Sequence, residues 1–172
     1  KANTSGDQNY TSNESVWNLT VGKRTTGILL DLSPGSPITY ETLTTAVCQV
    51  NNSEVTTNLY RNGSLVNVEN DTSVQLGAGY WEYVCNASET GNYTAASNQT
   101  FYQVDKYQKT VTLHINGSEA DLQTTYPYSV NVTAWSDRGS VSLEMNSSSI
   151  ENPFEAVLTA GFTYNFTAYS SG

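Results

Sequence analysis

The sequence is poor in charged residues, and basic residues are the scarcest. Lys and Arg number 7 and Asp and Glu 16, so charged residues make up 13% of the chain, against about 25% in an average soluble protein. Phosphate binding needs clustered Lys and Arg, so a net charge of −9 argues against nucleic acid. We interpret the acidity as a generic extracellular surface. The sharper alternative is an acid habitat, where protonated carboxylates would leave little self-repulsion.

Long hydrophobic runs are also missing. The best is Gly27–Leu30, far below the roughly 20 residues that span a membrane, so we expect no membrane span. The start of the sequence has no secretory leader either, and we expect Lys1 to follow one that has been removed.

Residues for catalysis and metal binding are few. His114 is the only histidine, and it lies in the alternating stretch Val111–Ile115, opposite the apolar residues. A solvent-facing strand histidine is therefore expected, rather than a general base. The acidic residues show no calcium or zinc spacing, and the glycines at 77–79 predict a turn, not a phosphate loop. We predict no active site, no metal site and no cofactor, hence no enzyme.

The chain has only two cysteines, Cys48 and Cys85. A disulfide is the natural interpretation for an exported protein. A free buried pair or a metal site are the alternatives.

What the chain does have is the triplet Asn-x-Ser/Thr, the acceptor for N-linked glycan. Ser and Thr supply 43 of 172 residues, so about four or five of the eighteen asparagines should match by chance, but fourteen do. They are Asn3, Asn9, Asn13, Asn18, Asn51, Asn62, Asn70, Asn86, Asn92, Asn98, Asn116, Asn131, Asn146 and Asn165. The excess predicts an exported surface glycoprotein with N-linked glycans as covalent modification.

Period-two alternation, with abundant Thr, Val and Tyr, predicts an all-β fold. The expected strands are Thr26–Leu32, Thr42–Val50, Val55–Arg61, Ser73–Leu76, Tyr80–Asn86, Thr100–Val104, Thr110–Ile115, Tyr128–Trp135, Ser140–Met145, Glu155–Leu158 and Thr163–Tyr169. Many short strands at this spacing are typical of β-sandwiches.

Two diverged repeats are visible. Thr39-Tyr40 recurs as Thr125-Tyr126, and the stretch 78–85 recurs, one residue shorter, as 160–166. The first repeat resembles an immunoglobulin-like sandwich. That resemblance implies a disulfide between strands B and F, a tyrosine corner at Tyr83, and Tyr60 where antibody domains have tryptophan.

The second repeat ends at Gly172 before a counterpart of the last strand of the first, while residues 9–23 match that strand in character. We expect three parts: an N-terminal donor strand (1–23), a complete immunoglobulin-like domain (24–106) and an incomplete one (107–172). Residues 1–8 fit a disordered polar tail. The donor face consists of Ser15, Trp17, Leu19 and Val21, and Asn18 lies on the opposite face.

An incomplete sandwich exposes an edge that another copy's strand can fill, and a contact that does not close on itself gives a filament. This arrangement resembles chaperone–usher pilins and, with its glycans, archaeal threads, which are filaments joined by donor-strand complementation. The resemblance implies an extracellular head-to-tail homopolymer serving adhesion or cell contact. The acceptor candidates are Leu113, Ile115, Phe162, Tyr164 and Phe166. The alternatives are a repeat of a long surface adhesin or S-layer-like protein, and a carbohydrate-binding module.

Overall fold

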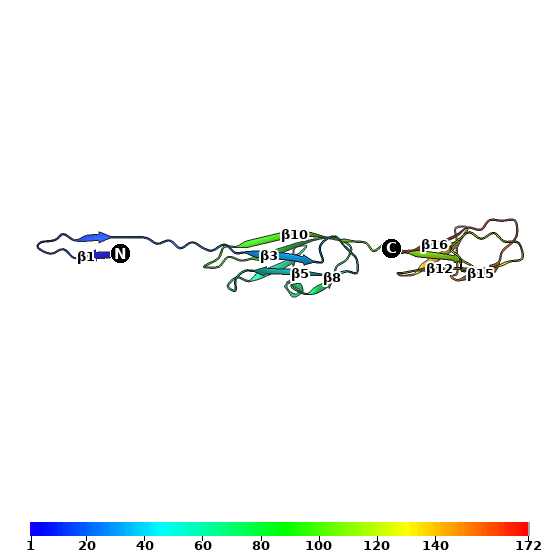
Figure 1. Cartoon of the computed structure of the whole chain (residues 1–172), viewed down its shortest axis with the longest axis horizontal. Coiled ribbons are helices and arrows are strands. Elements are labelled where there is room, and N and C mark those ends of the chain that lie inside the picture. Colours follow the sequence, from blue (N-terminus) through cyan, green and yellow to red (C-terminus); the bar gives the residue numbers. More distant parts are fainter. Residues whose placement is uncertain (172) are drawn as a thin grey trace. The chain divides into compact units, whose positions relative to one another are not determined.

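The computed structural model describes residues 1–171, and the fold is all-β. Apart from strands, it contains one short 3-10 helix, η1 (Asn67–Glu69). The chain divides into two compact units, unit 1 from Lys1 to Lys106 and unit 2 beginning at Tyr107 (Figure 1). None of the described residues forms a helix long and apolar enough to cross a membrane.

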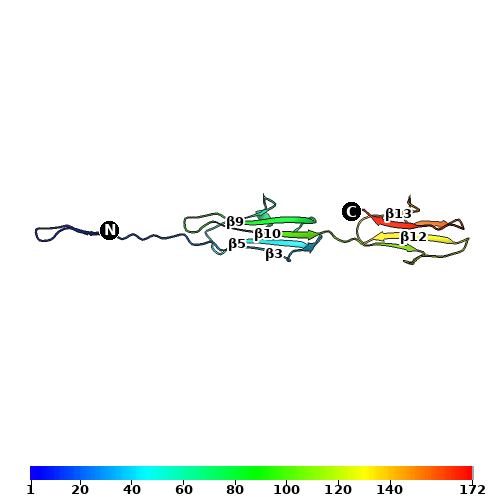
Figure 2. The same ribbon diagram turned by 90° about the horizontal axis from the view of Figure 1, so that it is seen from above.

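Unit 1 contains two sheets, whose strands face each other across one core (Figure 2). One sheet has the order β4-β10-β9-β6-β7 and the other β3-β5-β8. The strands are β3 (Ile28–Ser33), β4 (Ile38–Thr39), β5 (Leu43–Val50), β6 (Thr57–Arg61), β7 (Ser64–Leu65), β8 (Ser73–Gln75), β9 (Gly79–Ala87) and β10 (Ala96–Asp105). With β3, β5 and β8 as strands A, B and E, and β6, β9 and β10 as C, F and G, this order matches an immunoglobulin-like sandwich.

The core of unit 1 follows from alternation along its strands. In β5, for example, Thr44, Ala46 and Cys48 are buried while the residues between them are more exposed. Cys48 and Cys85 form a disulfide across the core, with their Cα atoms 5.5 Å apart, as expected from the sequence.

Two details of the expected core differ from the structure. Leu59, which lies opposite Cys85 in the β6–β9 register, is the fully buried residue of β6, while Tyr60 is only half-buried. Tyr83 is buried as expected, but among the described residues its hydroxyl has no hydrogen-bond partner, so the backbone bond of a tyrosine corner is missing. Burial raises the pKa of Tyr83, and the neighbouring Arg61 opposes that shift.

Unit 2 repeats part of this plan with two three-stranded sheets, β11-β12-β15 and β14-β13-β16. Its strands are β11 (Val111–Ile115), β12 (Ser129–Ser136), β13 (Val141–Met145), β14 (Ser148–Ile150), β15 (Phe154–Val157) and β16 (Phe166–Ser170). The last strand was expected to begin at Thr163, but residues 163–165 lie before it, outside any strand.

The N-terminal residues form a small hairpin. β1 (Ala2–Thr4) pairs antiparallel with β2 (Asn13–Ser15), and residues 16–23 have no regular secondary structure. The expectation of a disordered tail over 1–8 is therefore wrong for Ala2–Thr4. The expectation that residues 9–22 lack a partner in their own chain is wrong for 13–15, and it holds for the pairing of 16–22.

Candidate functional site

Two pairs of hydrogen bonds show how the two units correspond, residue by residue. In unit 1 the side chain of Asn70 bonds the backbone N–H and C=O of Cys48, and in unit 2 Asn152 does the same to Ala134. At the turn before the last common strand, Asn62 Oδ1 accepts from the N–H of Glu82, and Asn146 Oδ1 accepts from that of Asn165. The second correspondence makes β16 the equivalent of β9.

This correspondence locates an open sheet edge in unit 2. In unit 1, β9 lies between β6 and β10, and β10 is itself covered by β4. In unit 2, β16 pairs with β13 on one side, and no strand among residues 1–171 pairs with its other side. The open edge of β16 therefore has the place that β10 fills in unit 1. An unpaired edge is a template for another strand.

The core beside this edge is less enclosed than the core of unit 1. In unit 1, β10 contributes the buried side chains of Tyr102 and Val104. In unit 2 only Val132, Ala134 and Leu143 form the buried cluster, and the apolar residues packed around it are half-buried. The absence of a counterpart of β10 among the described residues explains this difference, because nothing replaces Tyr102 and Val104.

The acceptor candidates fall into two groups. Leu113, Ile115 and Phe166 pack against the buried cluster of unit 2. Phe162 and Tyr164 lie in the segment before β16, where their ring centroids are 6.5 Å apart. Phe162 is 72% exposed and Tyr164 is half-buried, with its hydroxyl donating to the carbonyl of Thr159. The structure therefore places three candidates at the core and leaves the other two at its margin.

The expected donor segment consists of apolar side chains in solvent. Trp17, Leu19 and Val21 are 88%, 89% and 85% exposed, and Val16 on the opposite face is also exposed. Ser15 lies in β2 and is exposed as well. Scattered exposed apolar residues are ordinary, but a contiguous run of this kind marks a surface that binds something.

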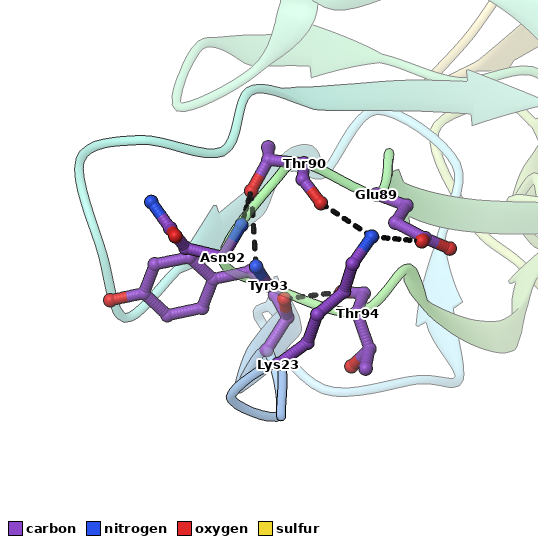
Figure 3. A network of polar contacts seen from close by, with 7 residues as sticks. Lys23, Glu89, Thr90, Asn92, Tyr93 and Thr94 are labelled. Carbon is purple, nitrogen blue, oxygen red and sulfur yellow. Dashed lines mark hydrogen bonds and ion pairs between the residues drawn. The ribbon is translucent and has the colours of Figure 1, made fainter. Parts of the chain in front are cut away.

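The chain is fixed to unit 1 directly after this segment (Figure 3). The Lys23 Nζ donates to the carbonyl of Thr90 at 2.7 Å and forms an ion pair with Glu89. The backbone of Arg24 forms a bridge with Tyr93, donating to Asn92 O and accepting from Thr94 N–H. The exposed segment therefore leaves unit 1 from one defined point, beside the loop that precedes β10.

The asparagines of the fourteen triplets are mostly accessible. Eleven are exposed, and only Asn70, Asn86 and Asn131 are half-buried. Asn62, Asn116 and Asn146 occupy turns with positive φ. Solvent exposure is what a bulky glycan requires.

The expected absence of enzymatic chemistry has less to report. His114 lies on β11 and its Nε2 is 3.2 Å from Glu119 Oε1. Within residues 1–171, no group of three or more His, Cys, Asp or Glu residues is placed to hold a metal ion.

Sequence reasoning missed two features of the site. One is the Lys23 anchor, for which an isolated lysine gives no signal. The other is the bonding of Asn70, which the sequence marks only as a glycan acceptor. Its counterpart Asn152, at the same place before the next strand, could have indicated a structural role. The sequence matches no known protein-family model, and no curated protein matches it.

Proposed function

We propose that the chain is the structural subunit of an extracellular, heavily N-glycosylated filament that serves adhesion or cell contact. A strand from one copy completes unit 2 of the next copy, so subunits join head to tail as a homopolymer. The observation that carries this proposal is the open edge of β16, at the place where β10 completes unit 1. The exposed segment containing Trp17, Leu19 and Val21 supports it from the other side.

The repeat supplies a specific register for the joint. In unit 1, Thr100 lies opposite Tyr83, Tyr102 opposite Trp81, and Val104 opposite Gly79. Residues 13–19 match 98–104 in character, and Asn165 is the equivalent of Glu82. Transferring the pairs places Ser15 opposite Phe166, Trp17 opposite Tyr164, and Leu19 opposite Phe162 of the neighbouring copy.

This register gives each apolar side chain a defined role. Trp17 and Leu19 take the places of Tyr102 and Val104, which are buried in unit 1. Each such burial contributes roughly 1.5–3 kcal/mol. A slip of one residue would turn both side chains to solvent and bring the Asn18 glycan against the core, so glycan and apolar residues enforce the same register.

The hairpin at the N-terminus is compatible with this joint. A strand has two edges, and β1 occupies only one edge of Asn13–Ser15. The other edge is available to β16. In the completed unit, β1 would then cover the outer edge of the donor strand, as β4 covers β10 in unit 1.

The two ends of unit 1 support joining between copies rather than within one. The donor segment leaves unit 1 beside Tyr93, just before β10 begins, and the connection to unit 2 follows Asp105, where β10 ends. A ten-residue strand is roughly 33 Å long. The five residues from Leu19 to Lys23 cover at most about 18 Å, so the donor and the connection point are well separated.

A charge in the donor face tests the proposal. Trp17→Asp should abolish filaments, because the carboxylate would enter the core of the neighbour's unit 2. Val16→Asp is the matched control, since it puts the same charge on the opposite face of the same segment. Electron microscopy and sedimentation measure assembly. Filaments of Trp17→Asp, or of a chain lacking residues 1–22, at wild-type yield would contradict the proposal.

The same open edge also supports a second candidate, a repeat of a long surface adhesin or S-layer-like protein. There the completing strand would belong to the same polypeptide. The mass of the deglycosylated native polypeptide distinguishes the two, since a subunit near 18.7 kDa differs greatly from a giant chain. For a carbohydrate-binding module, the exposed Trp135 is the only aromatic of note, and a glycan array would test it.

A further inference from the structure

Asn70 is a predicted glycan acceptor whose side-chain amide is already engaged. Its Oδ1 accepts from the backbone N–H of Cys48 at 2.8 Å, and its Nδ2 donates to the Cys48 carbonyl at 3.0 Å. The next residue, Asp71, donates its N–H to Ala46. These bonds attach the segment before β8 to β5, beside the disulfide.

The two side-chain bonds involve one edge of the amide. Both go to the N–H and C=O of a single residue, so the hydrogen that Asn70 donates is the one on the same side as its own Oδ1. A glycan converts the side chain to a secondary amide, which strongly prefers the trans form. In that form the sugar occupies the position of this hydrogen. A glycan and the pair of bonds to Cys48 therefore exclude each other.

Unit 2 contains the same pair of bonds without an acceptor triplet. Asn152 accepts from the N–H of Ala134 at 3.0 Å and donates to its carbonyl at 2.6 Å. Asn152 is followed by Pro153 and Phe154, so it cannot be an acceptor. The fold therefore uses an asparagine at this position for its hydrogen bonds, in both units.

We propose that Asn70 remains unmodified in the native protein and acts as a structural residue, while exposed triplets on turns carry glycan. Asn62 is the reference: it is exposed at a turn, only its Oδ1 is bonded, to the N–H of Glu82, and no bond of its Nδ2 is found among the described residues. The inference rests on the glycoprotein part of the proposed function and not on the filament. Thirteen of the fourteen triplets would then remain as candidate acceptors.

Glycopeptide mapping of protein purified from its native cells tests the proposal. The peptide with Asn70 should be found unmodified and the peptide with Asn62 modified. Glycan on Asn70 at an occupancy comparable to Asn62 would overturn this inference alone. Absence of glycan from every triplet would overturn it together with the glycoprotein part of the proposed function, so the two failures are distinguishable.

Variants test the structural role separately. Asn70→Asp keeps the acceptor oxygen but loses the donor, and should lower the unfolding midpoint of unit 1. Thr72→Val removes the acceptor triplet and keeps the amide, so it should change neither the midpoint nor the mass. Asn152→Asp is the matched control in unit 2, where the same loss should occur with no triplet present. Equal midpoints for Asn70→Asp and wild type, or a lower mass for Thr72→Val, would overturn the proposal.

Discussion

Two alanines of unit 2 occupy the positions of the cysteines in unit 1. Ala134 makes the hydrogen bonds with Asn152 that Cys48 makes with Asn70, and it lies opposite Leu113 as Cys48 lies opposite Leu30. Ala168 lies opposite Leu143 as Cys85 lies opposite Leu59. Unit 2 therefore has the geometry for the disulfide but not the covalent bond, and its stability depends on packing alone.

The double variant Ala134→Cys with Ala168→Cys should form a second disulfide. The sequence separation would be 34, close to the 37 of Cys48 and Cys85, and chain-entropy models give roughly 3–4 kcal/mol for closing such a loop. Thiol titration after air oxidation, followed by denaturant unfolding with and without reductant, measures both effects. The single variants serve as controls, and free thiols at both new positions after oxidation would contradict the equivalence of the two units.

Asp137 predicts acid sensitivity at the start of unit 2. It accepts from the backbone N–H of Thr110 at 2.9 Å and from the hydroxyl of Tyr107 at 2.9 Å. The pKa of Asp137 is lowered, mainly by the Thr110 N–H and then by Tyr107. A folded pKa below the unfolded value means that its contribution to stability is present above the ordinary aspartate pKa and is lost as the pH falls through the folded value.

Asp137→Asn should therefore flatten the acid side of the stability profile of unit 2. The amide oxygen can still accept from Thr110, but it does not titrate. Denaturant unfolding from neutral to strongly acid pH measures the profile, and Asp121→Asn, at an exposed position of the same unit, is the control. The same acid slope in Asp137→Asn and wild type would contradict the assignment.

At the scale of elements, alternation in the sequence located the longer strands well. All eleven expected strands occur, most with ends shifted by one to three residues, because a buried face requires period two whatever the partner. The short strands β4, β7 and β14 were missed, since two or three residues show no period and their pairing depends on neighbours in space. The same holds for β1, whose residues are all exposed.

The open edge could also be predicted from sequence, because it follows from the absence of one strand in a repeat. The hydrogen bonds around it could not. The bonding of Asn70 joins residues 22 apart and the Lys23 anchor joins residues more than 60 apart, and neither leaves a periodic pattern. Sequence alone gave Asn70 the wrong emphasis, as one acceptor triplet among fourteen.

Deleting residues 1–8 separates the role of the hairpin from that of the donor segment. The deletion removes β1 but keeps residues 9–22, and we expect filaments to form, because β16 needs only the donor strand. The joint should tolerate less denaturant, since the outer edge of the donor loses its cover. Filament yield and denaturant midpoints measure these effects. Complete loss of filaments would mean that β1, rather than residues 13–21, makes the essential contact.

At the scale of the whole molecule, the two units should differ in how they depend on assembly. Unit 1 has a disulfide, a complete pair of sheets and buried aromatic residues, Tyr83 and Tyr102. Unit 2 has a smaller buried cluster and an open edge. Unit 1 should therefore be stable in a monomer, whereas unit 2 reaches its full stability only with the strand of another copy. Binding to the folded state alone stabilises it by mass action.

Monomers of Trp17→Asp should accordingly show two unfolding transitions, with unit 2 melting first. In wild-type filaments the transition of unit 2 should rise above that of the monomer, because its core then holds Trp17 and Leu19 of a neighbour. Calorimetry of both forms, with hydrogen exchange to assign each transition to β9 or β16, measures this. Adding a peptide of residues 9–22 to the monomer should restore protection in β16 and leave β9 unchanged. Equal protection of β16 in monomer and filament would show that unit 2 is complete without a partner strand.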